Sequence, residues 1–199
     1  MHKSSYANMG CFVDKYLDLG KKLRVADIGG QDINGSYKPL FPPDRFDYVC
    51  CDVAEGPGVD VVLKNAYRWR ELRAGSFDVV ISGQAFEHIE YFWVTILEIA
   101  RILKDNGVCC IIAPSAGVRH RYPVDCWRFY EDGIRALAKY AYLTVLDAYT
   151  QSDRLHYVDL DPVWQDSVLI CRKPVFTHIQ KLKSGVRIWM SRRLVKSLV

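Results

Sequence analysis

The sequence lacks a long apolar run, which argues against a membrane-spanning protein. No stretch among its 199 residues approaches the roughly 18–20 consecutive apolar residues of a spanning helix. Its first ten residues, MHKSSYANMG, also lack the apolar segment of a secretory signal. We therefore expect a cytoplasmic protein.

A disulfide framework and a CxxC metal motif are also missing. The seven cysteines are an odd number, and two pairs are adjacent, Cys50 with Cys51 and Cys109 with Cys110. Adjacent residues of a strand point to opposite faces of a sheet. We interpret the cysteines as reduced core residues of a protein in a reducing compartment.

Acidic residues are absent from the end of the chain. From Arg172 onward there are eight Lys or Arg and no Asp or Glu, so the preceding part carries 19 basic against 23 acidic side chains. The net charge of +4 therefore comes from the C-terminal segment. A uniformly basic surface is not indicated, and no nucleic-acid partner is expected.

What is present predicts one α/β domain with a full core, because half of the residues are hydrophobic and a quarter are charged. Continuous apolar runs interleaved with helical segments favour a mostly parallel sheet with helices on both faces. The predicted fold is Rossmann-like and doubly wound. Strands are predicted at 23–28, 46–51, 59–63, 77–82, 108–113, 143–149 and 167–172, and helices at 8–19, 91–103 and 131–140.

One predicted connection is short. Only six residues separate Asp52 from Val59, whereas a crossover between parallel strands usually takes about ten or more. Either this crossover has lost its helix, or one of the two strands is misassigned.

Polar residues and glycines end the first two predicted strands. Asp27 precedes Gly29 and Gly30, and Asp52 ends the next strand. Ligands of open parallel sheets bind outside the carboxyl ends of the strands, so a nucleotide-type site is expected here. The dinucleotide fingerprint GxGxxG is missing. An acid before the glycines suits a cationic ligand, and one carboxylate at Asp52 can accept hydrogen bonds from two ribose hydroxyls.

Four stretches in order, RVADIGGQDINGSY, YVCCDVAEGPGVDVV, SFDVVISGQAFEHI and EIARILKDNGVCCIIAP, carry a family resemblance. Over roughly residues 20–115 the chain resembles the class I S-adenosylmethionine-dependent methyltransferases, particularly the small bacterial type. The resemblance implies a seven-stranded sheet whose last strand, at 167–172, is antiparallel. It also implies an enzyme that uses S-adenosylmethionine as cofactor.

The resemblance implies roles for individual residues. The methionine part of the cofactor would be held by Asp27, Gly29, Gly30 and Gln31, and its ribose by Asp52. The adenine would be flanked by Asn65 and Ala66, and the site would be closed beneath the methyl group by Ser82, Gly83 and Gln84. The sequence departs from the family at Gln31 and Ile33, where the second and third glycines of the usual pattern would stand. Either cofactor binding is weaker or the turn is rebuilt.

The dipeptide Glu87-His88 is common among such relatives. Some related O-methyltransferases carry metal ligands in an E-x-x-E-H pattern, but the first position here is Gln84, a poor ligand for a hard cation. No metal is predicted. His88 is interpreted either as a structural residue at a helix start or as a candidate base.

The segment 119–130, RHRYPVDCWRFY, is rich in residues that suit a pocket better than a core. It resembles the H-x-Y-P-x-D-x-W-R-F segment of a subgroup of these methyltransferases. His120 is the predicted general base, with Asp125 orienting its ring. Tyr122, Trp127 and Arg128 are predicted to bind substrate. The alternative is a lid held by an Arg128–Asp125 ion pair and anchored by Trp127.

We predict a methyltransferase domain at 1–173 and a basic amphipathic tail at 174–199, interrupted by Gly185. The tail either packs on the domain or another subunit, or lies on an anionic membrane surface such as the inner membrane. The predicted reaction methylates a hydroxyl of a small molecule or glycan. Two alternatives are an inactive cofactor-binding interaction module and a nicotinamide-dependent oxidoreductase.

Overall fold

A computed structural model describes residues 3–18, 20–151 and 163–196. Its centre is a seven-stranded sheet in the order β3-β2-β1-β4-β5-β7-β6. Strands β1 to β5 are parallel to one another, and β7 is antiparallel to both β5 and β6. The reversed seventh strand is thus confirmed. The bounds are β1 Leu23–Ile28, β2 Phe46–Asp52, β3 Val61–Val62, β4 Phe77–Gly83, β5 Leu103–Pro114, β6 Thr144–Thr150 and β7 Asp166–Arg172.

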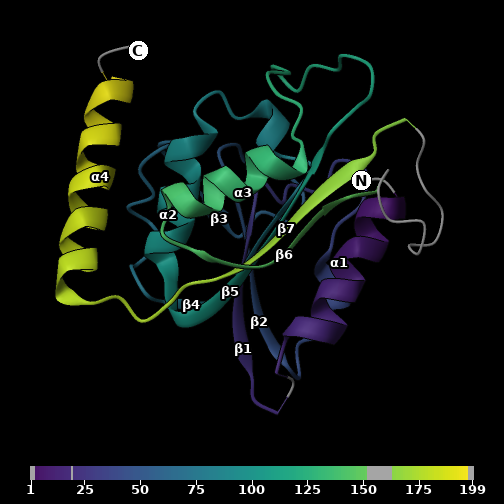
Figure 1. Cartoon of the computed structure of the whole chain (residues 1–199). Helices are drawn as coiled ribbons and strands as arrows, with labels where there is room; N and C mark the ends of the chain where they lie inside the picture. The colour runs from purple at the N-terminus through teal and green to yellow at the C-terminus, as the bar shows by residue number, and fades with distance from the viewer. Residues whose placement is uncertain (1–2, 19, 152–162, 197–199) are drawn as a thin grey trace.

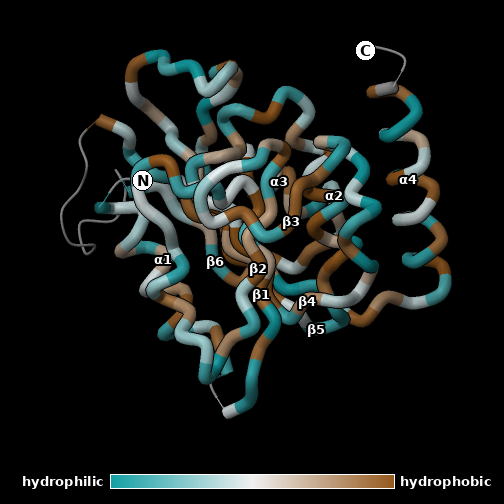
Figure 2. Tube along the Cα trace, turned by 180° about the vertical axis from the view of Figure 1, so that it is seen from behind, coloured by the Kyte–Doolittle hydropathy of each residue, from teal (hydrophilic) through white to brown (hydrophobic). Residues whose placement is uncertain are grey.

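Helices cover both faces of the sheet (Figure 1). α1 (Lys3–Tyr16) lies on one face, α2 (Phe92–Ile102) and α3 (Glu131–Tyr140) lie on the other, and α4 (His178–Lys196) stands outside α2. Two hydrophobic clusters fill the spaces between these layers. Figure 2 shows that the apolar residues are concentrated in the central strands. The predicted doubly wound α/β fold is confirmed.

Adjacent cysteines do point to opposite faces. Cys109 belongs to the cluster beneath α2 and α3, whereas Cys110 belongs to the cluster beneath α1. All seven cysteines lie in the described part of the chain and are free. They serve as small apolar core residues, apart from the exposed Cys126 and the half-buried Cys11.

The short link between β2 and β3 has no helix, so the first of the two alternatives is correct. The Asp60 amide donates to the Cys50 carbonyl (2.9 Å), and the Asp60 carboxylate accepts from the Cys50 amide (2.8 Å). These bonds hold the extended link along the sheet edge. The strand predicted at 59–63 is correspondingly reduced to Val61–Val62.

The first helix begins five residues earlier than predicted and ends at Tyr16. Its early turns bury polar side chains, which an apolar pattern does not reveal. Ser4 donates to Asp166 (3.0 Å), Ser5 shares a hydrogen bond with Tyr37 (2.6 Å), and Asn8 accepts from Tyr149 (3.0 Å). Hydrogen bonding makes this polar face compatible with burial. The end predicted at Leu19 lies outside the described residues.

α4 is tied to the body by a buried carboxylate. Glu98 of α2 is inaccessible to solvent, pairs with Arg192 of α4, and accepts from Arg101 (2.8 Å). The sequence predicted an interruption of this helix at Gly185, but the helix is continuous there. Packing on the body is therefore confirmed for one face, and the division into domain and tail stays a prediction. Among the described residues, no helix is long and apolar enough to cross a membrane.

Trp69 supplies the first testable prediction. It is 2% exposed in the cluster beneath α2, and its indole N–H donates to the Ala66 carbonyl (2.9 Å). We expect Trp69→Ala to lower the free energy of unfolding by about 3–5 kcal/mol, because it leaves a large cavity. Urea unfolding monitored by circular dichroism measures this. Trp189→Ala, at a tryptophan that is 56% exposed on α4, is the matched control and should cost about 1 kcal/mol or less. Equal losses would contradict the assignment of Trp69 to the core.

Candidate active site

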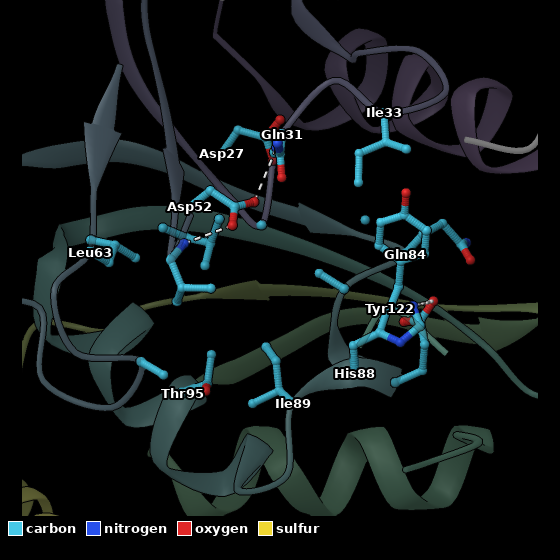
Figure 3. Close-up of a pocket in the computed structure, with 18 of the residues that line it drawn as sticks. Asp27, Gln31, Ile33, Asp52, Leu63, Gln84, His88, Ile89, Thr95 and Tyr122 are labelled. Atoms are coloured by element: carbon cyan, nitrogen blue, oxygen red, sulfur yellow. Dashed lines mark hydrogen bonds and ion pairs between the residues drawn. The ribbon is translucent and has the colours of Figure 1, made fainter. Parts of the chain in front are cut away.

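A pocket of about 380 Å³ opens at the carboxyl ends of the parallel strands. This volume is typical of a small-molecule site. Figure 3 shows Asp52 and Leu63 at one end of the pocket, and His88 and Tyr122 at the other. The parallel arrangement explains the location, because it brings the ends of β1, β2 and β4 to one edge of the sheet.

Glycines keep the strand ends open. Gly29 has φ +74°, and a Cβ there would lie 2.6 Å from the Cβ of Ala85. At Gly83 a Cβ would lie 2.1 Å from the Tyr37 hydroxyl oxygen. Larger residues at either position would displace neighbouring side chains of the pocket wall.

Asp27 lies buried at the end of β1 and lines the pocket. Its Oδ2 accepts a hydrogen bond from the Tyr48 hydroxyl, whereas its Oδ1 has no hydrogen-bond partner among the described residues. Burial raises the pKa of Asp27 to about 7; the Tyr48 hydrogen bond lowers it and nearby Asp52 raises it. An unsatisfied buried oxygen is costly, so it favours a cationic or hydrogen-bond-donating ligand.

Cofactor binding should therefore depend on pH. Below about pH 7 Asp27 is mainly protonated, and a neutral carboxyl attracts a cationic ligand less than a carboxylate does. We expect the affinity for S-adenosylmethionine to fall by up to about tenfold per pH unit as the pH decreases from about 7. Tyr48 and Cys50 also face this carboxyl group, and burial raises both their pKa values out of that range.

Isothermal titration calorimetry between about pH 5.5 and 7.5 measures this dependence. Asp27→Asn is the matched control, since it keeps the shape and removes the titrating group. Its affinity should be weaker and independent of pH in this range. A wild-type affinity that does not change with pH would contradict the role of Asp27.

Asp52 lies at the end of β2 with its carboxylate in the pocket. Oδ2 accepts from the backbone N–H of Gln31 (3.2 Å), and Oδ1 accepts from the backbone N–H groups of Val53 (2.7 Å) and Ala54 (3.3 Å). A carboxylate has about four acceptor sites and three are used by these amides, so capacity remains for one ligand hydroxyl. The residues present thus fit a cofactor that carries a ribose.

The turn that departs from the family pattern is rebuilt. The Gln31 side chain lies across Gly56, where a Cβ would come within 1.7 Å of Nε2, and Nε2 donates to the Glu55 carbonyl (3.4 Å). Ile33 is 44% exposed and lines the pocket. Gly35 takes up a left-handed conformation (φ +113°), so the turn keeps a flexible residue two positions further on.

The residues predicted to flank the adenine separate in the structure. Ala66 lines the pocket beside Leu63, Tyr67 and Trp69. Asn65 is not in the pocket wall, because its side-chain oxygen accepts from the Tyr67 amide (2.9 Å) and caps the local turn. The apolar wall fits a flat ring, and a role for the Asn65 side chain is not supported by its placement.

The predicted turn after β4 is likewise divided. Gly83 and Gln84 line the pocket, but the fully buried Ser82 donates to the Ile28 carbonyl (2.8 Å) and joins β4 to β1. Gln84 has φ +57°, and its side-chain Nε2 donates to Asp166 (2.8 Å) and Ser5 (3.2 Å). These bonds tie the turn to β7 and α1, so Ser82 supports the site without lining it.

The opposite end of the pocket carries titratable side chains. Glu87, His88 and His120 all line it, and the two imidazole rings meet edge to face at 4.9 Å. Burial raises the pKa of Glu87 to about 8 and lowers the pKa of His88. His120 contacts Asp125, whose Oδ2 lies 3.5 Å from the ring Nδ1 and 2.7 Å from the backbone nitrogen. The structure therefore brings the predicted base and its predicted partner together.

Asp125 is mainly the partner of Arg128. Two guanidinium nitrogens contact its two oxygens at 2.6 and 2.9 Å, and this pairing lowers the pKa of Asp125 to about 2. Trp127 donates its indole N–H to the carbonyls of Ile89 (3.1 Å) and Glu90 (3.2 Å). The braced loop considered as an alternative is thus present.

The structure places the three residues predicted to bind substrate differently. Trp127 and Arg128 are outside the pocket wall, and their polar groups are used by the carbonyls of residues 89 and 90 and by Asp125. Tyr122 does line the pocket and is 58% exposed at its mouth. Tyr122 alone of the three is placed to touch a substrate.

The sequence analysis missed two residues of the pocket wall, Tyr37 and Trp164, and one residue behind it, Tyr48. Tyr48 donates to Asp27, Tyr37 packs beneath Gly83, and Trp164 contacts the His120 ring at 4.6 Å. For Tyr48 alone the sequence held a signal, the alternation of side chains along a strand. Tyr48 is two residues before Cys50 and so shares its strand face, and Cys50 is the residue that pairs with Asp27 in the sheet.

The strand order and the reversed β7 are those of the class I S-adenosylmethionine-dependent methyltransferase fold. Residues 49–111 match the model of a methyltransferase domain family. The predicted family, enzyme class and cofactor agree with both findings. No curated protein matches the chain.

Solved structures show which particular proteins share the fold. A 1,6-didemethyltoxoflavin-N1-methyltransferase from Burkholderia thailandensis, solved with 1,6-didemethyltoxoflavin and S-adenosylhomocysteine bound, has a TM-score of 0.64 and 16% identity over 86% of this chain and 80% of that chain. The [4+2]-cyclase SpnF has a TM-score of 0.64 and 15% identity over 85% and 81%. The CurJ carbon methyltransferase has a TM-score of 0.63 and 11% identity over 85%, and the chain spans 54% of that structure. These likenesses establish the fold.

Proposed function

We propose that the protein transfers the methyl group of S-adenosylmethionine to a hydroxyl of a small molecule or glycan. The observation that carries this proposal is one pocket with two chemically different ends. Asp52 offers hydrogen-bond acceptors at one end, and His88 and His120 lie at the other.

The residues divide the work between binding and proton removal. The bound cofactor supplies an already activated methyl group, so the protein mainly aligns the reactants and excludes water. Asp27 and Asp52 hold the cofactor, and the apolar wall at Leu63 and Ala66 takes its flat ring. His120 accepts the proton of the acceptor hydroxyl, and Asp125 fixes the ring through the contact at Nδ1. Tyr122 at the mouth packs against the acceptor.

The test has a binding stage and a turnover stage. Calorimetry should detect binding of S-adenosylmethionine and S-adenosylhomocysteine, and mass spectrometry should detect methylated products from a panel of glycosides and phenols. Absence of binding would overturn the proposal. Binding without product across the panel would favour the inactive cofactor-binding module. The fold alone does not decide between these functions, because SpnF has the same fold and is named for a cyclisation. A nicotinamide oxidoreductase is disfavoured by the missing fingerprint, and titration with the reduced dinucleotide tests it.

We also propose that α4 makes peripheral contact with an anionic membrane, as part of a cytoplasmic location. Opposite the side that packs on α2, the helix exposes Ile179, Leu182, Val186 and Trp189, each between 48% and 70%. The helix carries basic residues and no acidic ones. Such a surface suits anionic lipid headgroups. Co-sedimentation with phosphatidylserine vesicles should decrease in the double variant Leu182→Ser/Trp189→Ser, and equal sedimentation would exclude the contact.

A further inference from the structure

Three potential metal ligands converge at the end of the pocket opposite Asp52, where the proposed function places the methyl acceptor (the acceptor end). Glu87 and His88 belong to the short 3-10 helix Phe86–His88, and His120 belongs to the loop after β5. One ligand atom from each lies within 4.8 Å of the other two. The carboxylate Oε1 of Glu87 is 3.6 Å from the Nε2 of His88. Two ligand atoms of a tetrahedral zinc ion lie about 3.3 Å apart, given bonds of about 2.0–2.1 Å, so this pair is close to metal-binding geometry.

The Glu87 carboxyl group has no other use in the described structure. Its side chain is 1% exposed, and neither oxygen has a hydrogen-bond partner among the described residues. Burial of a carboxyl group without hydrogen bonds is strongly unfavourable. A cation bound between Glu87 and the two histidines would satisfy both oxygens and explain why they face the pocket wall unpaired.

The histidines present their free nitrogens to the same place. His88 Nδ1 lies 2.6 Å from the Val124 carbonyl oxygen, which can only accept, so Nδ1 carries the proton and Nε2 offers a lone pair. Metal-bound histidines usually donate their second ring nitrogen in this way. In His120 the Nδ1 contacts Asp125 and the Val118 carbonyl, which leaves Nε2 for a ligand.

The surrounding charges tolerate a cation. The guanidinium of Arg128 is paired with both oxygens of Asp125. Trp164 packs against the His120 ring and shields this side of the cluster. The cluster lies in the wall of the pocket, so a metal with three protein ligands would keep an open position toward a substrate.

We propose that Glu87, His88 and His120 form a binding site for a divalent transition-metal ion of the zinc type. One carboxylate and two imidazoles are a donor set that such ions prefer, and Mg²⁺ would prefer more oxygen ligands. A metal there would bind the acceptor hydroxyl and lower its pKa, replacing His120 as the group that activates it. This last role rests on the proposed methyl transfer, whereas metal binding itself does not.

The experiment measures metal binding without substrate. The protein is stripped with a chelator and titrated with ZnCl₂ by calorimetry, in a Cys126→Ser background so that the exposed thiol does not bind the ion. One site is expected. Its affinity should fall at least about tenfold in Glu87→Gln and in His120→Ala, because even loss of an outer-sphere partner costs about 10–100-fold. His178→Ala, at an exposed histidine of α4, is the matched control and should bind normally.

Substitution of Co²⁺ adds a second readout, since its visible absorption reports the coordination number of the bound ion. A spectrum of four-coordinate cobalt that disappears in Glu87→Gln supports the site. Circular dichroism checks that this variant folds, and His120→Ala, in the loop, provides the independent test. No zinc binding, or binding equal in all variants, would overturn the metal site. Methylation by the chelator-treated protein would then leave the proposed function intact.

Discussion

Asp52→Ala is expected to weaken S-adenosylmethionine binding by about 10–100-fold. A hydrogen bond to a charged group contributes about 1.5–3 kcal/mol, and Asp52 has one acceptor site left for a ribose hydroxyl, so this loss sets the expected size. The variant also removes the acceptor for the Gln31 and Val53 amides, so Asp52→Asn should be measured beside it. Asparagine keeps one carbonyl oxygen and the shape of the side chain, and it should lose less affinity than alanine. Calorimetric titration provides both values.

Asp47→Ala is the matched control for Asp52. Asp47 lies near the opposite end of β2, is largely exposed, and pairs with Arg24 (3.1 Å). Surface ion pairs of this kind contribute about 1 kcal/mol or less, so its removal should leave cofactor affinity unchanged. If Asp52→Ala bound the cofactor as tightly as Asp47→Ala, the assignment of Asp52 to the ribose would be wrong.

His120→Ala is expected to lower kcat by about 10²–10⁴-fold while cofactor affinity stays near that of the wild type. Loss of a positioned general base typically has an effect of this size. His120 and Asp52 belong to opposite ends of the pocket, which explains why binding and turnover should separate. The measurement is turnover at saturating cofactor, with affinity determined separately by calorimetry.

His178→Ala is the control histidine and should retain full turnover. Retention of full turnover by His120→Ala, with the cofactor bound normally, would refute a catalytic role for His120. Glu87→Gln then distinguishes the two roles of that histidine. A general base aligned by Asp125 does not need the Glu87 carboxylate, whereas a metal site does.

Much of the fold was predictable because its signals are local. Parallel strands buried on both faces are continuous apolar runs, and the run 23–28 matches β1 without error. The helix predicted at 131–140 matches α3 because its signal is also local, with apolar residues at helical spacing. Errors arose where burial was achieved by polar groups, as at Ser4 and Ser5 of α1.

The site was predictable only in part. Asp27 and Asp52 were found because strand ends in a parallel sheet meet at one edge. The position of Trp127 and Arg128 outside the pocket wall could not be predicted, because residue type does not reveal that their polar groups are used by neighbouring carbonyls and by Asp125. No metal was predicted because Gln84 stands at the first position of the related metal pattern, and such a linear pattern does not include His120, 32 positions after His88.

The sequence by itself determined the α/β architecture, the edge of the sheet at which the pocket opens, and the basic segment without acidic residues at the end of the chain. These features depend on residue type and short-range spacing. Tertiary structure alone decided which side chains share the acceptor end. Glu87, His88 and His120 meet there because the loop after β5 folds back over the end of β4, where the Cys126 amide donates to the Glu87 carbonyl (2.8 Å). Such long-range hydrogen bonds leave no periodic trace in a sequence.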